Sequence, residues 1–470
     1  MTSLFILYSP QFQPIPTCAH AASPEKEATK AQQILDRWVK RKRLQNLKIG
    51  VAMKGLNSSH QAKIDAETLY NPASGTKLLT SAAVMHTWKL DKRFQTRIHG
   101  HIVDGRTDNH GLWVVGGGAP QLSAQELEVL AETLTSKGLK HVTGPLHLDL
   151  SIFDGNNLPP AYEQKSTTSA YRASIGAFGV DYGAITISIQ PVRTSTKPKV
   201  LLTSAKGYAL LENRARQDDG KKNALKYRLR PMKNGRMKVT IHGTIGRKHP
   251  SLTQRLRMLN PNLGAAHILQ ESLLRRGVKI DSAVDSSGTL PPSLGLLAEH
   301  KGATLKELLG GVNTYSNNFM AETIFKHLGK TWPGSQERVT KALESLGLTA
   351  GTFKIVNGSG LYRATTISPD AMLKLLVIMA KHPTLGGPFQ QTLAVSGQPG
   401  TLQRRLNKRL RGAVRGKTGT LNEVVTLSGY LETKTSGGLA FAIFINESTE
   451  DRIASVRREI DRLLEQWSRL

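Results

Sequence analysis

The spacing of apolar residues predicts two helices and two strands in the first 90 residues of the chain. Residues 26–46 repeat apolar positions with the period of an amphipathic helix and carry a basic cluster on the opposite side. Residues 48–56 alternate as a strand does, and a further strand-like stretch ends at Leu69. Pro72, which suits the first turn of a helix, precedes a helical pattern that runs through Met85.

The middle of the chain changes to short strands separated by glycine-containing turns. Residues 226–230 and 238–242 both alternate, and the Asn234-Gly235 pair between them is a strong hairpin signal. This pattern predicts a small β-rich module at residues 192–245.

The C-terminal part returns to helices and ends with two long strands and a last helix. The apolar stripe of that helix would suit a membrane surface, but we expect it to pack against the two strands before it. The predicted elements are helices at 264–276, 304–329, 337–346, 368–381 and 451–470, and strands at 424–432 and 439–446, joined by a turn at 436–438.

The composition and length of the chain indicate a globular protein with more than one domain and a strongly basic character. At 470 residues it exceeds the size at which a single core stops growing, about 250 to 300 residues. The net charge of +29 indicates an anionic partner or surface, or else reflects a basic proteome or a solubility constraint without a specific ligand. Nucleic acid is disfavoured because no reader module is recognisable, whereas an anionic cell-wall polymer or membrane surface fits a basic exported protein.

The cysteine and histidine content argues against metal chemistry. Cys18 is the only cysteine, which excludes an intrachain disulfide and a cysteine-based zinc site. The 14 histidines offer no His-Glu-x-x-His pair. We therefore expect neither a metal nor a cofactor.

Residues 1–22 read as either a signal peptide or a disordered leader. An apolar run at 4–8 and the small-residue pattern at 19–21 favour a signal peptide, but the first basic residue is Lys26. Elsewhere no apolar run reaches the roughly 18 residues of a membrane-spanning helix.

Ser74 and Lys77 place a hydroxyl and an ammonium one turn apart on the same helix face. A serine needs a base within reach to act as a nucleophile, and a lysine can serve if burial, a second cation or the helix N-terminus lowers its pKa. A second Ser-x-x-Lys, at Ser23 and Lys26, begins in a polar tail before a proline. We therefore predict that Ser74 is the nucleophile and Lys77 its base.

Ser316-Asn317-Asn318 is the only Ser-x-Asn in the chain and lies where a loop meets a helix. Ser316 could pass a proton toward a leaving amine, while Asn318 could hold a substrate amide and orient Lys77. Taken alone, such a stretch is more often a helix cap.

Lys417-Thr418-Gly419-Thr420 contains the only Lys-Thr-Gly and fits an edge strand beside residues 424–432. Glycine lets a substrate backbone approach closely, and the hydroxyls and ammonium suit a carboxylate. Seven cations occur here within fourteen residues with no acid among them, and they either form a solvated face or steer an anionic substrate. These are Arg404, Arg405, Lys408, Arg409, Arg411, Arg415 and Lys417.

Together, the order and spacing of the three motifs resemble the signature of penicillin-interacting enzymes. From about residue 47 to 447 the chain resembles a class C low-molecular-mass penicillin-binding protein, of the D-Ala-D-Ala carboxypeptidase/endopeptidase family. At three positions the family often has Asp where this chain has Asn317, Asn357 and Pro399. None of these three departures removes a side chain to which a catalytic or binding role is assigned. Further phrases that carry the resemblance are Phe94-Gln95-Thr96, Gly358-Ser359-Gly360-Leu361, Gly400-Thr401-Leu402 and Leu427-Ser428-Gly429-Tyr430.

The resemblance implies an α/β (α+β) fold with a penicillin-binding transpeptidase/β-lactamase-like domain. This domain is an antiparallel sheet flanked by helices, and it carries inserted β-rich domains. The implied catalytic domain is discontinuous, at residues 23–95 and 296–470. The inserted domain II would span 96–191 and 246–295, with a small basic domain III nested at 192–245.

The resemblance also implies a periplasmic serine-type D-alanyl-D-alanine carboxypeptidase and DD-endopeptidase that cleaves peptidoglycan peptides and is acylated by β-lactams. A β-lactamase or esterase on the same scaffold, and a non-catalytic basic protein that binds cell-wall polymers, stay open as alternatives. An α/β-hydrolase is disfavoured because no Gly-x-Ser-x-Gly occurs. By resemblance the catalytic residues are Ser74, Lys77, Ser316, Asn318 and Lys417, and the substrate-binding residues are Thr418, Gly419 and Thr420.

Overall fold

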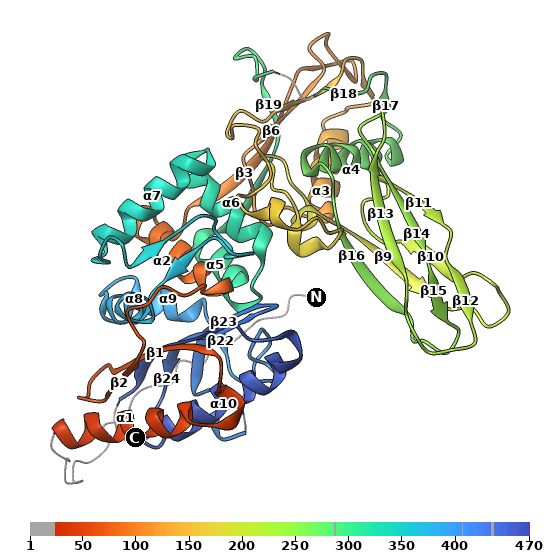
Figure 1. Ribbon diagram of the computed structural model, residues 1–470. Coiled ribbons are helices and arrows are strands. Elements are labelled where there is room, and N and C mark those ends of the chain that lie inside the picture. Colours follow the sequence, from red (N-terminus) through yellow and green to blue (C-terminus); the bar gives the residue numbers. More distant parts are fainter. Residues whose placement is uncertain (1–23, 286–287, 407, 434–436) are drawn as a thin grey trace.

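Figure 1 shows the computed structural model, which describes residues 24–285, 288–406, 408–433 and 437–470. The predicted leader at 1–22 and residue Ser436 of the last predicted turn lie outside the described residues. In the described part of the chain, no helix combines the length and the apolar character needed to cross a bilayer.

Strands from both ends of the chain form one antiparallel sheet in the order β2-β1-β25-β24-β23-β22. β1 pairs with β25 along all eight of its residues. The strand expected to end at Leu69 ends at Ile64, because Asp65 takes a left-handed conformation (φ 42°) that interrupts the extended backbone. The strands are β1 (Lys48–Gly55), β2 (Gln61–Ile64), β22 (Ala394–Val395), β23 (Val414–Leu421), β24 (Val424–Leu431) and β25 (Leu439–Asn446).

Helices cover both faces of this sheet (Figure 1). α1 and α10 pack on one face, where Trp38, Ile460 and Trp467 share a buried core with β24 and β25. This confirms that the last helix packs against the strands before it. The other face carries α8, which contacts β1 and β25. The bounds are α1 (Pro24–Val39), α2 (Thr76–Thr87), α7 (Trp332–Ser345), α8 (Pro369–Lys381), α9 (Gly386–Gln391) and α10 (Ile453–Trp467).

The single helical stretch expected at 304–329 is divided in two. α5 (Leu305–Thr314) and α6 (Asn318–Gly329) are separated by a loop in which Ser316 adopts a φ of 61°. This left-handed residue ends the helical path, so periodicity alone did not reveal the break.

The chain between α2 and α5 forms a group of smaller sheets that extends away from the six-stranded sheet (Figure 1). Its five-stranded sheet has the order β18-β8-β6-β3-β19. The strands are β3 (Arg93–His99), β6 (Leu112–Gly116), β8 (Leu146–Asp149), β18 (Val284–Asp285) and β19 (Leu296–Thr304). A four-stranded sheet contains β4 (Ile102–Val103), β5 (Arg106–Thr107), β7 (His141–Val142) and β17 (Lys279–Ile280).

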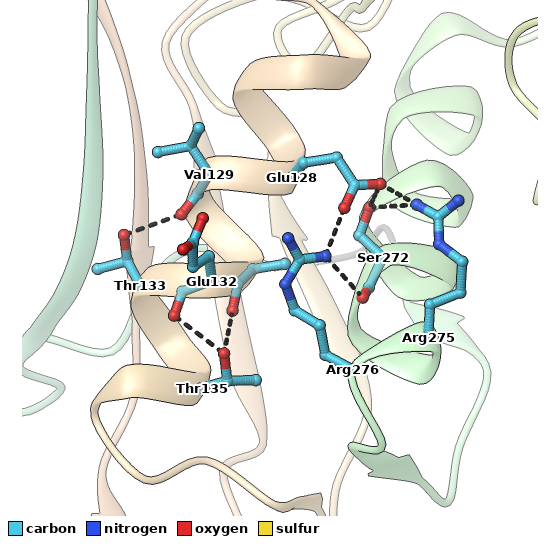
Figure 2. Close-up of polar contacts among 9 residues, drawn as sticks. Glu128, Val129, Glu132, Thr133, Thr135, Ser272, Arg275 and Arg276 are labelled. Atoms are coloured by element: carbon cyan, nitrogen blue, oxygen red, sulfur yellow. Dashed lines mark hydrogen bonds and ion pairs between the residues drawn. The ribbon is translucent and has the colours of Figure 1, made fainter.

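Two helices of this region, α3 (Ala124–Ser136) and α4 (Pro261–Arg275), are fastened to each other by a polar cluster (Figure 2). Glu128 of α3 accepts a hydrogen bond from Oγ of Ser272 at 2.7 Å and forms ion pairs with Arg275 and Arg276. One carboxylate therefore ties α3 to the C-terminal turn of α4.

The predicted hairpin is confirmed at the far end of this region. β13 (Lys226–Pro231) and β14 (Met237–His242) pair antiparallel, and Gly235 supplies the positive φ (77°) of the turn. β10, which lies within 192–245, pairs with β9, which precedes it. The remaining strands are β9 (Ala184–Gln190), β10 (Lys199–Leu202), β11 (Ala209–Asn213), β12 (Arg216–Asp218), β15 (Thr244–Gly246) and β16 (Leu252–Arg257).

Candidate active site

A short 3-10 turn places Ser74 directly before α2. The turn spans Ala73–Gly75. Ala73 is buried with a φ of 46°, a strained value for a residue with a side chain, and its N–H donates to Oδ1 of Asn71 at 2.8 Å. Ser74 itself is partly exposed. Its hydroxyl is therefore presented from a tightly fixed backbone.

Lys77 makes three polar contacts that orient its amine toward Ser74. Its Nζ lies 3.1 Å from Oγ of Ser74, 2.8 Å from Oδ1 of Asn318 and 2.8 Å from the carbonyl oxygen of Ser359. The amide and carbonyl oxygens can only accept, so they take both N–H groups of a neutral amine. The lone pair is then left facing the Ser74 hydroxyl.

Burial lets Lys77 hold this neutral form near pH 7. The side chain has no exposed surface, and loss of solvation lowers the pKa of Lys77 to about 7, although the charge of Glu322 acts to raise it. An amine with this pKa can accept the proton of a serine that attacks a carbonyl.

Glu322 is a site residue whose role the motifs did not reveal. Its carboxylate is fully buried and accepts the N–H groups of Gly358 and Ser359 at 2.9 and 2.8 Å. Burial, the largest influence, raises the pKa of Glu322, while the bonds from this loop and the charge of Lys77 oppose it. Glu322 thus fixes the loop whose carbonyl orients Lys77. A carboxylate inside an apolar helical stretch is the available sequence signal.

The Ser316-Asn317-Asn318 stretch combines the two roles weighed for it. Asn317 is the N-cap of α6, where its side chain accepts the N–H of Met320. Ser316 accepts a hydrogen bond from Nζ of Lys417 at 2.9 Å, and Asn318 reaches Lys77. Only the middle residue is a cap, and its two neighbours join the site.

Alternation along β23 sends its four motif residues to two sides. Lys417 is fully buried, and burial followed by the charge of Lys77 holds its pKa well below the ordinary value. Gly419 lies against the Ser74 turn, since a Cβ there would overlap Oγ1 of Thr426 and lie 2.6 Å from the carbonyl oxygen of Pro72. Thr418 and Thr420 pair with Leu427 and Val425, on the face that α10 covers.

Five of the eight predicted residues form two contacting groups, and Gly419 lies against the Ser74 turn, whereas Thr418 and Thr420 lie on the other face of β23. Ser74, Lys77 and Asn318 form one connected group, and Ser316 and Lys417 form a second. A cavity of about 410 Å³ borders Ser316 and Asn318 and is lined by aromatic side chains that include Tyr171 and Tyr315. This space adjoins both groups and is large enough for part of a peptide.

The run of cations at 404–417 is partly neutralised by acids from α10. Arg405 forms an ion pair with Asp461 at 2.6 Å, and Arg409 pairs with Glu465 at 3.5 Å. These contacts tie α10 to the segment that precedes β23, so the run is not a uniformly free cationic face. Among the described residues, no group of three or more His, Cys, Asp or Glu side chains is arranged to hold a metal ion.

Comparisons with known proteins identify the family of the chain. The family model described as D-Ala-D-Ala carboxypeptidase 3 (S13) matches residues 31–467. The chain is 31% identical to a D-alanyl-D-alanine carboxypeptidase of Actinomadura sp. (strain R39) over 80% of this chain and 73% of that one. It is 25% identical to D-alanyl-D-alanine carboxypeptidase DacB of Haemophilus influenzae over 87% and 88% of the two chains.

The fold is shared with a solved structure, penicillin binding protein 4 of Haemophilus influenzae. The TM-score is 0.79 at 22% identity, over 96% of this chain and 100% of that one. The predicted α/β architecture is thereby confirmed. The chain belongs to the D-Ala-D-Ala carboxypeptidase 3 (S13) family of serine peptidases, in accord with its resemblance to the class C low-molecular-mass penicillin-binding proteins.

Proposed function

We propose that the protein is a serine-type D-alanyl-D-alanine carboxypeptidase and DD-endopeptidase that acts on peptidoglycan peptides through an acyl-enzyme on Ser74. The observation that carries the proposal is the position of the buried Lys77 amine, 3.1 Å from the Ser74 hydroxyl. The side-chain oxygen of Asn318 and the carbonyl oxygen of Ser359 hold the amine there. Membership of a carboxypeptidase family supports the same reaction.

The reaction begins when Ser74 Oγ attacks the D-alanyl carbonyl carbon and its proton passes to Lys77. The N–H groups of Ser74 and Thr420 stabilise the oxyanion, at about 3 to 4 kcal/mol per donor. Ser316, in contact with Lys417, or Lys77 returns a proton to the leaving amine. Water then hydrolyses the ester and regenerates the serine.

The substrate C-terminus is assigned to β23. Thr418 and Thr420 supply hydroxyls and Lys417 supplies an amine donor for a carboxylate. Asn318, whose Nδ2 now donates to the carbonyl of Tyr171 at 2.9 Å, lies where a substrate amide would contact the site.

Two measurements test the proposal. Incubation with a pentapeptide muropeptide should release D-alanine, and a cross-linked muropeptide should be cut to monomers, while Ser74→Ala does neither. Intact-mass and peptide mass spectrometry should locate a penicilloyl adduct on Ser74. Absence of D-alanine release and of any adduct in the folded wild-type protein would rule the proposal out.

β-Lactams are proposed as covalent inhibitors of the same serine. The Haemophilus influenzae relative has been solved in complex with a β-lactam, which supports this assignment. A slowly released adduct is expected. Rapid turnover of the β-lactam would instead favour a β-lactamase on this scaffold.

A second proposed property is binding to an anionic cell-wall or membrane surface. Residues 192–245 contain 14 Lys and Arg against 3 Asp and Glu. Lys226, Arg228 and Arg230 are all exposed at alternate positions of β13, so they lie along one face of the strand. Charge reversal of these three should abolish sedimentation with isolated cell walls and its salt dependence, while penicillin acylation of Ser74 is retained.

We also propose the division into a discontinuous catalytic domain (23–95 and 296–470), an inserted domain (96–191 and 246–295) and a nested basic domain (192–245), located in the periplasm. The six-stranded sheet, built from both chain ends, supports the discontinuous domain. Cell fractionation with a periplasmic marker tests the location.

A further inference from the structure

Arg457 of α10 contacts Thr420 of β23 on the face of the sheet that α10 covers. Its Nη2 donates a hydrogen bond to Oγ1 of Thr420 at 2.9 Å. Thr420 is exposed and Thr418 partly exposed, and alternation puts both hydroxyls on this side of β23. Arg457 is thus the side chain through which the last helix reaches the strand assigned to the substrate carboxylate.

Burial lowers the pKa of Arg457 and the nearby charge of Asp461 opposes this, but the guanidinium of Arg457 forms no direct ion pair among the described residues. Asp461, one turn further along α10, is engaged by Arg405 at 2.6 Å, and Nη2 of Arg405 also lies 3.3 Å from the carbonyl oxygen of Arg457. Among the described residues, no carboxylate lies within ion-pair distance of the Arg457 guanidinium. A partly buried guanidinium that forms no direct ion pair and donates to a hydroxyl is suited to an anionic ligand.

We propose that Arg457 is a positioning residue that sets the preference for substrates with a free carboxylate on the leaving group. The inference rests on the proposed function and deepens it. By occupying a lone pair of the Thr420 hydroxyl, Arg457 turns the O–H of Thr420 toward the ligand, and its charge strengthens the bond that the carboxylate accepts. The carboxylate recognised is the one on the leaving residue of a D-alanyl peptide and the one on a β-lactam.

Arg457 contributes to the binding of the substrate and not to the chemical step. The carboxylate carries its charge before and after acyl transfer, so its interaction is equal in ground and transition states. Loss of Arg457 should therefore raise KM and leave kcat nearly unchanged. A merely structural role for Arg457 would weaken all substrates alike.

A matched pair of substrates separates these cases. The probes are an acyl-D-alanyl thioester whose leaving group ends in a carboxylate, and the same thioester as its neutral methyl ester. Arg457→Ala should lower kcat/KM for the carboxylate about 10- to 100-fold, the usual range for a bond to a charged group, and leave the methyl ester almost unaffected. Arg457→Lys should restore part of the loss, and Arg457→Gln, which keeps a donor without the charge, should restore less.

Arg458 provides the control. It is the next residue of α10, carries the same charge and is exposed, so Arg458→Ala should leave the ratio of the two substrates as in the wild type. Thermal unfolding checks the fold of each variant, and Arg457→Gln carries the comparison if Arg457→Ala does not fold.

Equal losses on both thioesters, or an unchanged ratio in Arg457→Ala and Arg457→Gln, would overturn the inference. Failure of the proposed function is a different result, because the wild-type protein would then cleave neither thioester and form no penicilloyl adduct.

Discussion

Lowering the pH provides a direct test of Lys77 as the base. Because the pKa of Lys77 lies at about 7, about half of the molecules hold the neutral amine at pH 7, about a tenth at pH 6 and about a hundredth at pH 5. At the ordinary lysine pKa of 10.5, only about 3 molecules in 10⁴ would be neutral at pH 7. The second-order rate of acylation by penicillin should therefore rise about tenfold per pH unit up to about pH 7 and level off above it.

The assay is stopped-flow acylation with a fluorescent penicillin at constant ionic strength, with the adduct confirmed by intact mass. Glu322→Gln supplies an independent check, since the charge of Glu322 is the influence that raises the pKa of Lys77. Its removal should move the midpoint to lower pH. The pH midpoint of the acylation rate is compared between the two proteins, and not the maximal rate at high pH. The maximal rate is unsuitable because the amide introduced by Glu322→Gln would also disturb the hydrogen bonds from the N–H groups of Gly358 and Ser359.

Two results would refute this reasoning. One is a midpoint above about pH 9, which would mean that burial does not hold Lys77 neutral. The other is a midpoint that rises in Glu322→Gln, opposite in sign to the removal of a negative charge. Circular dichroism at each pH excludes unfolding as the cause of lost rate.

Three further outcomes are expected. Gly419→Ala should lower the free energy of unfolding by about 1 to 3 kcal/mol and slow acylation, because the added Cβ meets Thr426 and Pro72 where β23 supports the Ser74 turn. Thermal unfolding and acylation rates measure the two effects, and wild-type values would contradict this packing. Ser316→Ala should slow turnover about 10²- to 10⁴-fold with little change in melting temperature, and a wild-type rate would remove Ser316 from the proton path. A metal chelator should leave acylation unchanged, since the attacking and accepting groups are side chains, and a loss restored by added zinc would require a different mechanism.

The sequence predicted the site best where its chemistry is local. Ser74 and Lys77 are neighbours on one helical turn, so their spacing alone implied contact. The last helix and the hairpin around Gly235 were likewise predicted from periodicity and turn residues. In each case, the information lies within a few consecutive residues.

What the sequence did not reveal depends on contacts between distant segments. Glu322 meets the loop at Gly358 and Ser359, and Arg457 meets Thr420, in each case across 36 or more positions of the chain. The break at Ser316 and the early end of β2 follow from single left-handed residues, Ser316 and Asp65, that periodicity does not register.

The pairing of β1 with β25 constrains how the protein can be made. The edge of β1 that pairs with β25 has no partner until some 400 further residues have been synthesised. This hydrogen-bonding edge therefore stays open while the rest of the chain emerges. The interposed sheets have mostly nearer partners and can acquire structure earlier. Chains that are cut short before residue 439 would therefore leave this edge exposed and be prone to aggregate, even if the sheets between α2 and α5 were intact.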